Sequence, residues 1–164
     1  MEFYKAPLWR VPVVLGTLGI FCRILSLVGG ILWGTYLRAQ GPDPETGAII
    51  LSSGPVPAIV AVVSCVLFWW AGWQFIRGLT RRQIFLSATI MVVFHAVLLA
   101  AEQIGQSMGG YPLTVYHLYA LTEGTLWVIQ LLVRLFDDWS LLLACVSVFA
   151  PYLYIVFGKK DAPL

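Results

Sequence analysis

The chain has 164 residues, of which 60% are hydrophobic and 11% charged, and its formal net charge is +2. A soluble domain of this size needs about 25% charged residues to cover its surface, so the composition excludes a water-soluble globular domain and indicates lipid as the main solvent. The small charge, scattered along the chain, also excludes nucleic acid as a partner.

Five apolar stretches are long enough to be transmembrane helices, which need about 20 residues each. We predict an all-α integral membrane protein, a compact bundle of about five transmembrane helices that forms one domain over residues 1–164. The first stretch, from Val11 to Leu37, is too long for a signal peptide. The predicted helices are residues 12–37, 56–77, 83–106, 113–136 and 139–157.

The distribution of basic residues predicts the orientation, because short cytoplasmic loops are rich in lysine and arginine. Lys5 and Arg10 precede the first helix, and three arginines lie in the 77–82 turn, so we predict a cytoplasmic N-terminus. Five crossings would place Lys159 and Lys160 outside, against this rule. Four crossings plus a re-entrant or interfacial segment are the alternative.

The sequence indicates no metal site and no particular cofactor. Its three cysteines, Cys22, Cys65 and Cys145, lie in apolar runs without the spacing of metal ligands. A haem held by His95 and His117 is disfavoured, because the two residues differ in depth by about 1.5 helical turns.

Ionisable side chains within the predicted helices are the most informative feature. A charge at the bilayer centre costs at least about 2.5 kcal/mol on insertion scales, so such residues face protein or water. They are Arg23, His95, Glu102, His117 and Glu123.

Helical periodicity brings most of these residues to the seam between the third and fourth helices. Matching depths across this antiparallel pair predicts contacts of Glu102 with His117 and of His95 with Glu123, and makes Glu123 the nearest partner of Arg23. We therefore predict a ligand-binding site at this seam. It comprises Arg23, His95, Glu102, His117, Tyr119, Glu123 and Trp127.

The first helix carries a separate face of small residues. Ser26, Gly30 and Gly34 repeat every four residues, a pattern that permits close helix approach. This face predicts a protein partner or self-association.

The predicted function is binding or transport of a small or lipid-like ligand at the seam, with proton coupling through His95 and Glu123. Membrane lipids and a small hydrophobic ligand are the expected partners. One alternative is a non-catalytic subunit of a larger complex, in which the polar residues only join helices, at about 0.6 kcal/mol per hydrogen bond. Another is an enzyme that uses a His/Glu pair as acid and base on a lipid-like substrate. No nucleophile or zinc motif supports the enzyme.

Overall fold

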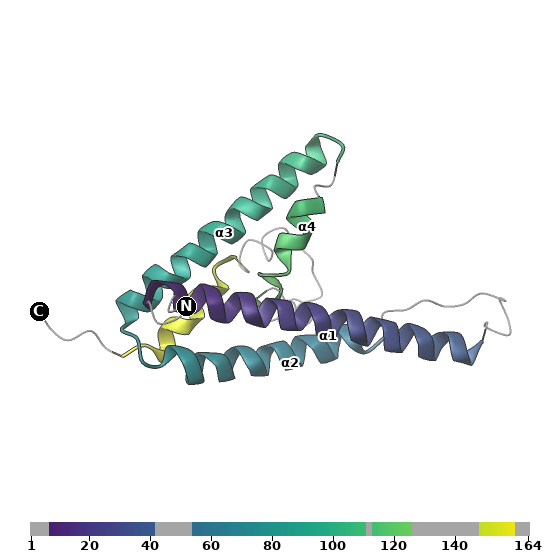
Figure 1. The fold of residues 1–164 in the computed structure, drawn as a ribbon, viewed down its shortest axis with the longest axis horizontal. Helices are drawn as coiled ribbons and strands as arrows, with labels where there is room; N and C mark the ends of the chain where they lie inside the picture. The colour runs from purple at the N-terminus through teal and green to yellow at the C-terminus, as the bar shows by residue number, and fades with distance from the viewer. Residues whose placement is uncertain (1–6, 42–53, 111–112, 126–147, 160–164) are drawn as a thin grey trace, which may run out of the picture.

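The computed structural model describes residues 7–41, 54–110, 113–125 and 148–159 (Figure 1). Of these residues 86% are helical, and no strand occurs among them. Three helical stretches are long and apolar enough to cross a membrane, and they coincide with the first three predicted helices. They are Pro7–Gln40, Val56–Ile76 and Arg81–Ser107.

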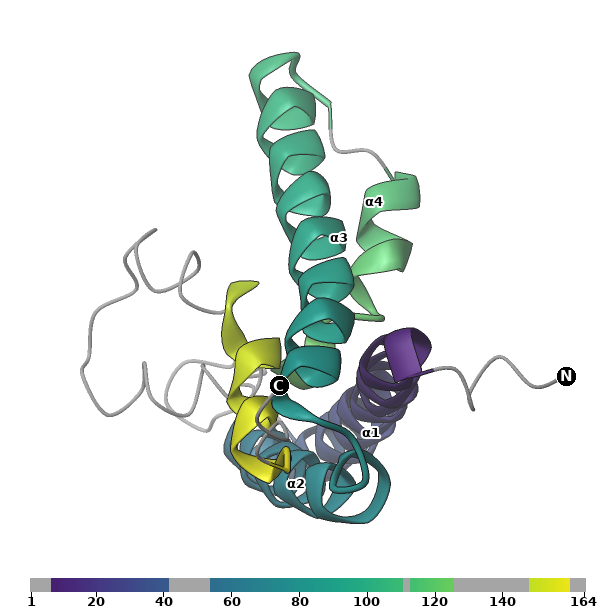
Figure 2. The same cartoon turned by 90° about the vertical axis from the view of Figure 1, so that its left-hand side faces the viewer.

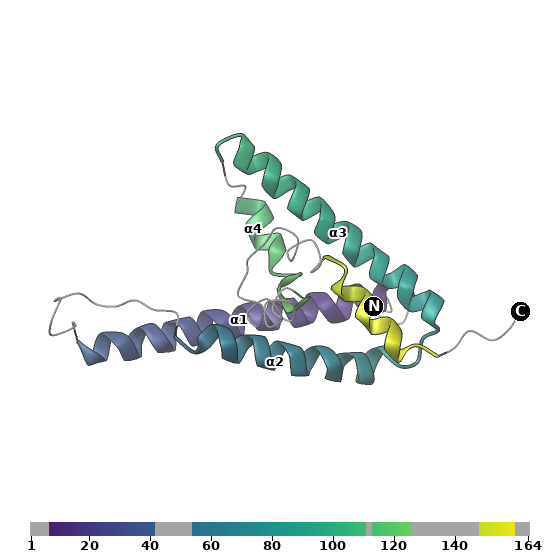
Figure 3. The same cartoon turned by 180° about the vertical axis from the view of Figure 1, so that it is seen from behind.

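Helices α1 (Arg10–Gln40) and α2 (Val56–Ala71) form an antiparallel pair, and the C-terminal part of α1 projects beyond α2 (Figures 1 and 3). A short 3-10 helix, η2 (Pro7–Trp9), precedes α1. In the buried interior of the pair, Cys22 Sγ and Ser64 Oγ share a hydrogen bond of 3.0 Å. Cys22 is buried and Cys65 is half-buried.

The chain turns sharply between α2 and α3 (Arg81–Ser107). At the end of α2 the helix widens into a π-helix, η3 (Gly72–Ile76). Thr80 then caps α3: its Oγ1 accepts a hydrogen bond from the Gln83 N–H at 3.3 Å, and Gln83 Oε1 accepts one from the Thr80 N–H at 3.0 Å. This reciprocal capping box fixes where α3 begins.

Both ends of the described chain lie beside this turn. Ser87 Oγ of α3 accepts a hydrogen bond from the Val11 N–H at 3.1 Å, which holds the start of α1 against α3. The Lys159 N–H donates to the Leu79 carbonyl at 3.0 Å, and the Arg81 N–H donates to the Lys159 carbonyl at 3.2 Å. Five complete crossings would place Lys159 at the opposite end, so this arrangement does not fit that count.

The fourth predicted helix is interrupted. α4 (Leu113–Tyr119) runs back from the far end of α3 toward α1, and a turn over residues 120–122 follows it (Figure 1). A short helical stretch resumes at residues 123–125. Residues 126–136 of the predicted helix lie outside the described residues.

The last described helix is a 3-10 helix, η4 (Ala150–Phe157), whereas the sequence predicts an α-helix over 139–157. Residues 139–147 lie outside the described residues. η4 and α4 flank α3 on opposite sides (Figure 2). Tyr154 of η4 stacks on Phe68 of α2 at a centroid distance of 4.3 Å, and Tyr152 stacks on Phe85 of α3 at 5.1 Å. This aromatic packing holds η4 in a geometry that is uncommon over eight residues.

Candidate functional site

The candidate site lies where α1 meets the segment that follows α4. The backbone of this segment turns tightly, with the Thr122 N–H donating to the Tyr119 carbonyl at 2.9 Å. A Cβ atom at Gly19 would collide with the backbone of Ala120 and Leu121, and one at Gly124 would come within 2.9 Å of a Leu18 side-chain carbon. The two glycines therefore let the backbones approach closely.

An ion pair lies directly beyond this crossing. The Arg23 guanidinium, one turn along α1 from Gly19, donates a hydrogen bond to Oε1 of Glu123. Their side chains are 24% and 11% exposed. The predicted pairing of Arg23 with Glu123 is confirmed. Because each charge is largely withdrawn from solvent, removal of either partner would leave the other uncompensated.

Two residues of α3 approach the same region through Tyr119. The Tyr119 hydroxyl donates to Glu102 Oε2 at 2.6 Å, a short bond of the kind expected between a phenol and a carboxylate. The His95 ring lies edge-on to the Tyr119 ring, at a centroid distance of 6.2 Å and an interplanar angle of 81°. Tyr119 thus connects α4 to both polar residues of α3.

Among the residues that the structure describes, two buried polar atoms of this cluster find no hydrogen-bond partner: His95 Nε2 and Glu123 Oε2. His95 is 1% exposed and Glu123 is 8% exposed. The predicted contact of His95 with Glu123 is therefore not a hydrogen bond between these two atoms. Since more than about 90% of buried polar groups in proteins find a partner, these atoms are the ones that a bound polar group would satisfy.

The remaining predicted site residues are placed less centrally. His117 lies on the exposed side of α4. Its predicted contact with Glu102 stays a prediction. Trp127 lies outside the described residues.

Sequence reasoning missed two buried threonines at the break after α4. Thr122 and Thr125 are each 1% exposed. Their hydroxyls donate to the carbonyls of Tyr119 and Thr122, at 3.0 and 2.7 Å. The run Thr122-Glu123-Gly124-Thr125 contains three residues of low helix propensity, and that was the available signal for the break.

The chemistry that this cluster supports is hydrogen bonding, ion pairing and proton exchange. In the described part of the chain, no three His, Cys, Asp or Glu side chains group closely enough to hold a metal ion. An imidazole nitrogen can donate or accept a proton according to its protonation state, whereas an ionised carboxylate oxygen only accepts. Together, His95 and Glu123 can bind a group that carries both a donor and an acceptor.

Comparisons with protein families, with curated proteins and with solved structures find no match to this chain.

Proposed function

We propose that the chain is an integral membrane protein with a cytoplasmic N-terminus. Its exterior is strongly apolar: Ile31, Leu32 and Val66 are 68%, 66% and 63% exposed. In the three long helices, the most hydrophobic 18-residue windows are only 28%, 33% and 39% buried. Such a surface is unusual for a soluble protein and suits lipid.

The chain crosses the membrane four times, and the last crossing is shared by the α4 region and η4. The hydrogen bonds between Lys159 and the turn before α3 support an even number. Four crossings also remove the conflict with the positive-inside rule, because the basic residues at this end of the bundle then share the cytoplasmic side. They are Arg10, Arg77, Arg81, Arg82 and Lys159.

Cysteine accessibility tests this topology in a variant without the native cysteines. A membrane-impermeant maleimide should label Met108→Cys in intact cells, because Met108 is 82% exposed at the far end of α3. Gly78→Cys and Lys159→Cys should react only after permeabilisation. Labelling of Lys159→Cys in intact cells, with Gly78→Cys still protected, would contradict four crossings and support the five-crossing topology. Labelling of Gly78→Cys in intact cells would reverse the orientation.

The polar cluster of Arg23, His95, Glu102, Tyr119 and Glu123 binds a small or lipid-like ligand. It couples binding or transport of this ligand to protonation. The observation that carries this proposal is the presence of unpartnered His95 Nε2 and Glu123 Oε2 beside the Arg23–Glu123 ion pair. A helix break at membrane depth supports it further, since transporters use discontinuous helices to form midplane sites. Simple interhelical packing does not require two unsatisfied polar atoms.

The chain contains two histidines, which allows a matched test of proton coupling. His95→Gln removes the buried titratable group, and His117→Gln makes the same change on the exposed side of α4. The amount of small molecule retained by the purified protein is measured by native mass spectrometry from about pH 4 to pH 8, a window wider than that of an exposed histidine because His95 is buried. We expect pH-dependent retention in the wild type and in His117→Gln, and pH-independent retention in His95→Gln. Unchanged pH dependence in His95→Gln would refute the coupling.

A second candidate function is that of a subunit docked through α1. A Cβ atom at Gly29 would meet Val56 of α2 at 2.9 Å, whereas Cβ atoms at Gly30 and Gly34 would meet no described atom within 4 Å. Val56 is the first residue of α2, so Gly30 and Gly34 follow the last α1 glycine that contacts α2. The small-residue face of Ser26, Gly30 and Gly34 thus suits a second helix.

A further inference from the structure

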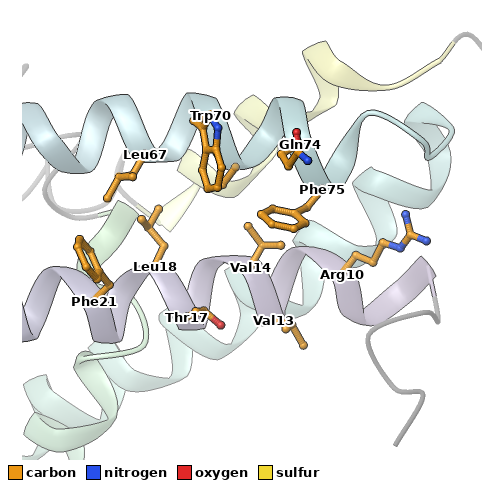
Figure 4. A pocket seen from close by; sticks show the side chains of 11 residues that line it. Arg10, Val13, Val14, Thr17, Leu18, Phe21, Leu67, Trp70, Gln74 and Phe75 are labelled. Carbon is orange, nitrogen blue, oxygen red and sulfur yellow. The ribbon is translucent and has the colours of Figure 1, made fainter.

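A cavity of about 620 Å³ lies between α1 and the α2–η3 helix, and its lining includes Leu18, which also contacts Gly124 at the crossing described above (Figure 4). None of the predicted site residues lines it. Its walls are apolar and open outward, since Phe21, Trp70 and Phe75 are 49%, 56% and 49% exposed. The cavity is therefore a groove on the lipid-facing side of the bundle.

The groove is built into the helix pair. Trp70 and Phe75 meet edge to face at a centroid distance of 5.8 Å, and together they form one wall. Phe75 lies in the π-helical segment η3, whose wider turn changes the direction of the side chains that follow α2. On the other wall, Val14 and Leu18 of α1 point toward α2 (Figure 4).

One end of the groove is positively charged. Arg10 lies at this end, next to the 77–82 turn: a Cβ atom at Gly78 would be 3.7 Å from Arg10 Nη1 (Figure 4). The carboxylates among the described residues are Glu102 and Glu123, and the ion pair found among these residues joins Glu123 to Arg23 and does not involve Arg10. Gln74 lines the same part of the groove and adds a neutral hydrogen-bonding group.

The length of the groove matches one leaflet. From Arg10 to Phe21 α1 rises by about 16 Å, and half of a bilayer's hydrocarbon core is about 15 Å thick. With the basic end on the cytoplasmic side, the groove reaches from the headgroup region to the midplane. Anionic lipids are concentrated in that leaflet in many membranes.

We infer that this groove binds an anionic phospholipid, with an acyl chain along Val14, Leu18 and Trp70 and the phosphate on Arg10. A phospholipid fits better than a soluble anion, because most of the lining is apolar and only one end carries charge. This inference rests on the proposed membrane embedding, but not on the polar cluster at His95 and Glu123.

The test uses the purified full-length protein and two lipids with the same chains, dioleoyl phosphatidylglycerol and dioleoyl phosphatidylcholine. Native mass spectrometry should show preferential binding of phosphatidylglycerol to the wild type. Arg10→Gln should weaken that binding by about tenfold or more, as expected for loss of a charge-assisted hydrogen bond. Arg10→Lys should retain most of it. Arg82→Gln, which removes an exposed charge at the same end, is the control for general attraction and should change the affinity much less.

A second pair of variants tests the groove itself. Thr17 is exposed and lines the groove, so Thr17→Trp places a large side chain in the groove and should reduce binding of both lipids. The control is Thr35→Trp, at an exposed position farther along α1, which should leave binding of both lipids unchanged. Equal effects of Arg10→Gln and Arg82→Gln, or unchanged binding in Thr17→Trp, would overturn the inference. Oleate that competes as well as phosphatidylglycerol would overturn the choice of a phospholipid. His95→Gln should bind phosphatidylglycerol normally, which separates this site from the proposed function.

Discussion

Replacing Arg23 with leucine should lower the free energy of unfolding by about 3–5 kcal/mol, the usual cost of removing one partner from a buried ion pair. The carboxylate of Glu123 would then be left without its cation, although its side chain is only 11% exposed. Thermal or denaturant unfolding in a fixed detergent measures the loss. The matched control is Arg38→Leu, in the last turn of α1, where the arginine is exposed and the change should be small.

The double variant Arg23→Leu/Glu123→Leu distinguishes the loss of the ion pair itself from the cost of leaving the Glu123 carboxylate buried without its cation. Replacing both partners of a buried pair by apolar residues is often neutral or stabilising, so the double variant should recover most of the stability lost in Arg23→Leu. An unchanged unfolding free energy in Arg23→Leu would mean that Arg23 reaches water or lipid headgroups. A double variant no more stable than the single variant would place the loss in the packing of Arg23.

Gly19→Ala should be the most damaging methyl addition on α1. Its Cβ would lie 2.8 Å from the Leu121 carbonyl carbon, and closer still to the Ala120 oxygen, so the backbone itself must move. Overpacking of this kind costs about 1–3 kcal/mol. The displacement would also separate Arg23 from Glu123, so the loss should lie at or above the top of that range. The same unfolding measurement tests it.

Gly30→Ala makes the same change on the same helix, where no described atom lies within 4 Å of the added methyl group. We expect the isolated protein to keep its stability, because alanine is also the better helix former. Equal losses in Gly19→Ala and Gly30→Ala would contradict the close crossing at Gly19. If Gly30→Ala instead leaves the isolated chain intact but disrupts an assembly in membranes, the subunit function gains support.

The three long helices were predictable because each is a continuous apolar run bounded by turn residues. The predicted spans 12–37 and 83–106 differ from α1 and α3 only at their ends. The Arg23–Glu123 pair was also predictable, because two opposite charges at matching depth leave few other partners in an apolar bundle.

Helical periodicity alone does not determine the rest of the site. It assumes a continuous α4, whereas the turn at residues 120–122 changes the rotation of residues 123–125 relative to Tyr119. Glu123 still meets Arg23, but among the described residues its Oε2 and His95 Nε2 have no hydrogen-bond partner. The last helix is apolar on all sides, so its pattern does not distinguish an α-helix from the 3-10 helix of η4.

The groove between α1 and the α2–η3 helix could not be predicted from the sequence, for a related reason. Val14, Trp70 and Phe75 read as ordinary apolar residues of two helices, and the sequence pattern does not show the π-helical segment Gly72–Ile76 that carries Phe75. Arg10 was assigned to the cytoplasmic side by its charge, but its place at the end of a groove depends on how the two helices pack.

The central claim is that His95 Nε2 and Glu123 Oε2 form part of a ligand site. An experimental density map of the protein in lipid nanodiscs, prepared without added ligand and at a resolution that shows ordered water, tests it most directly. We predict non-protein density within hydrogen-bond distance of both atoms, with the Arg23–Glu123 pair intact beside it. A map in which both atoms are hydrogen-bonded to protein groups, with no space between them, would contradict the claim and leave the cluster as a structural joint between helices.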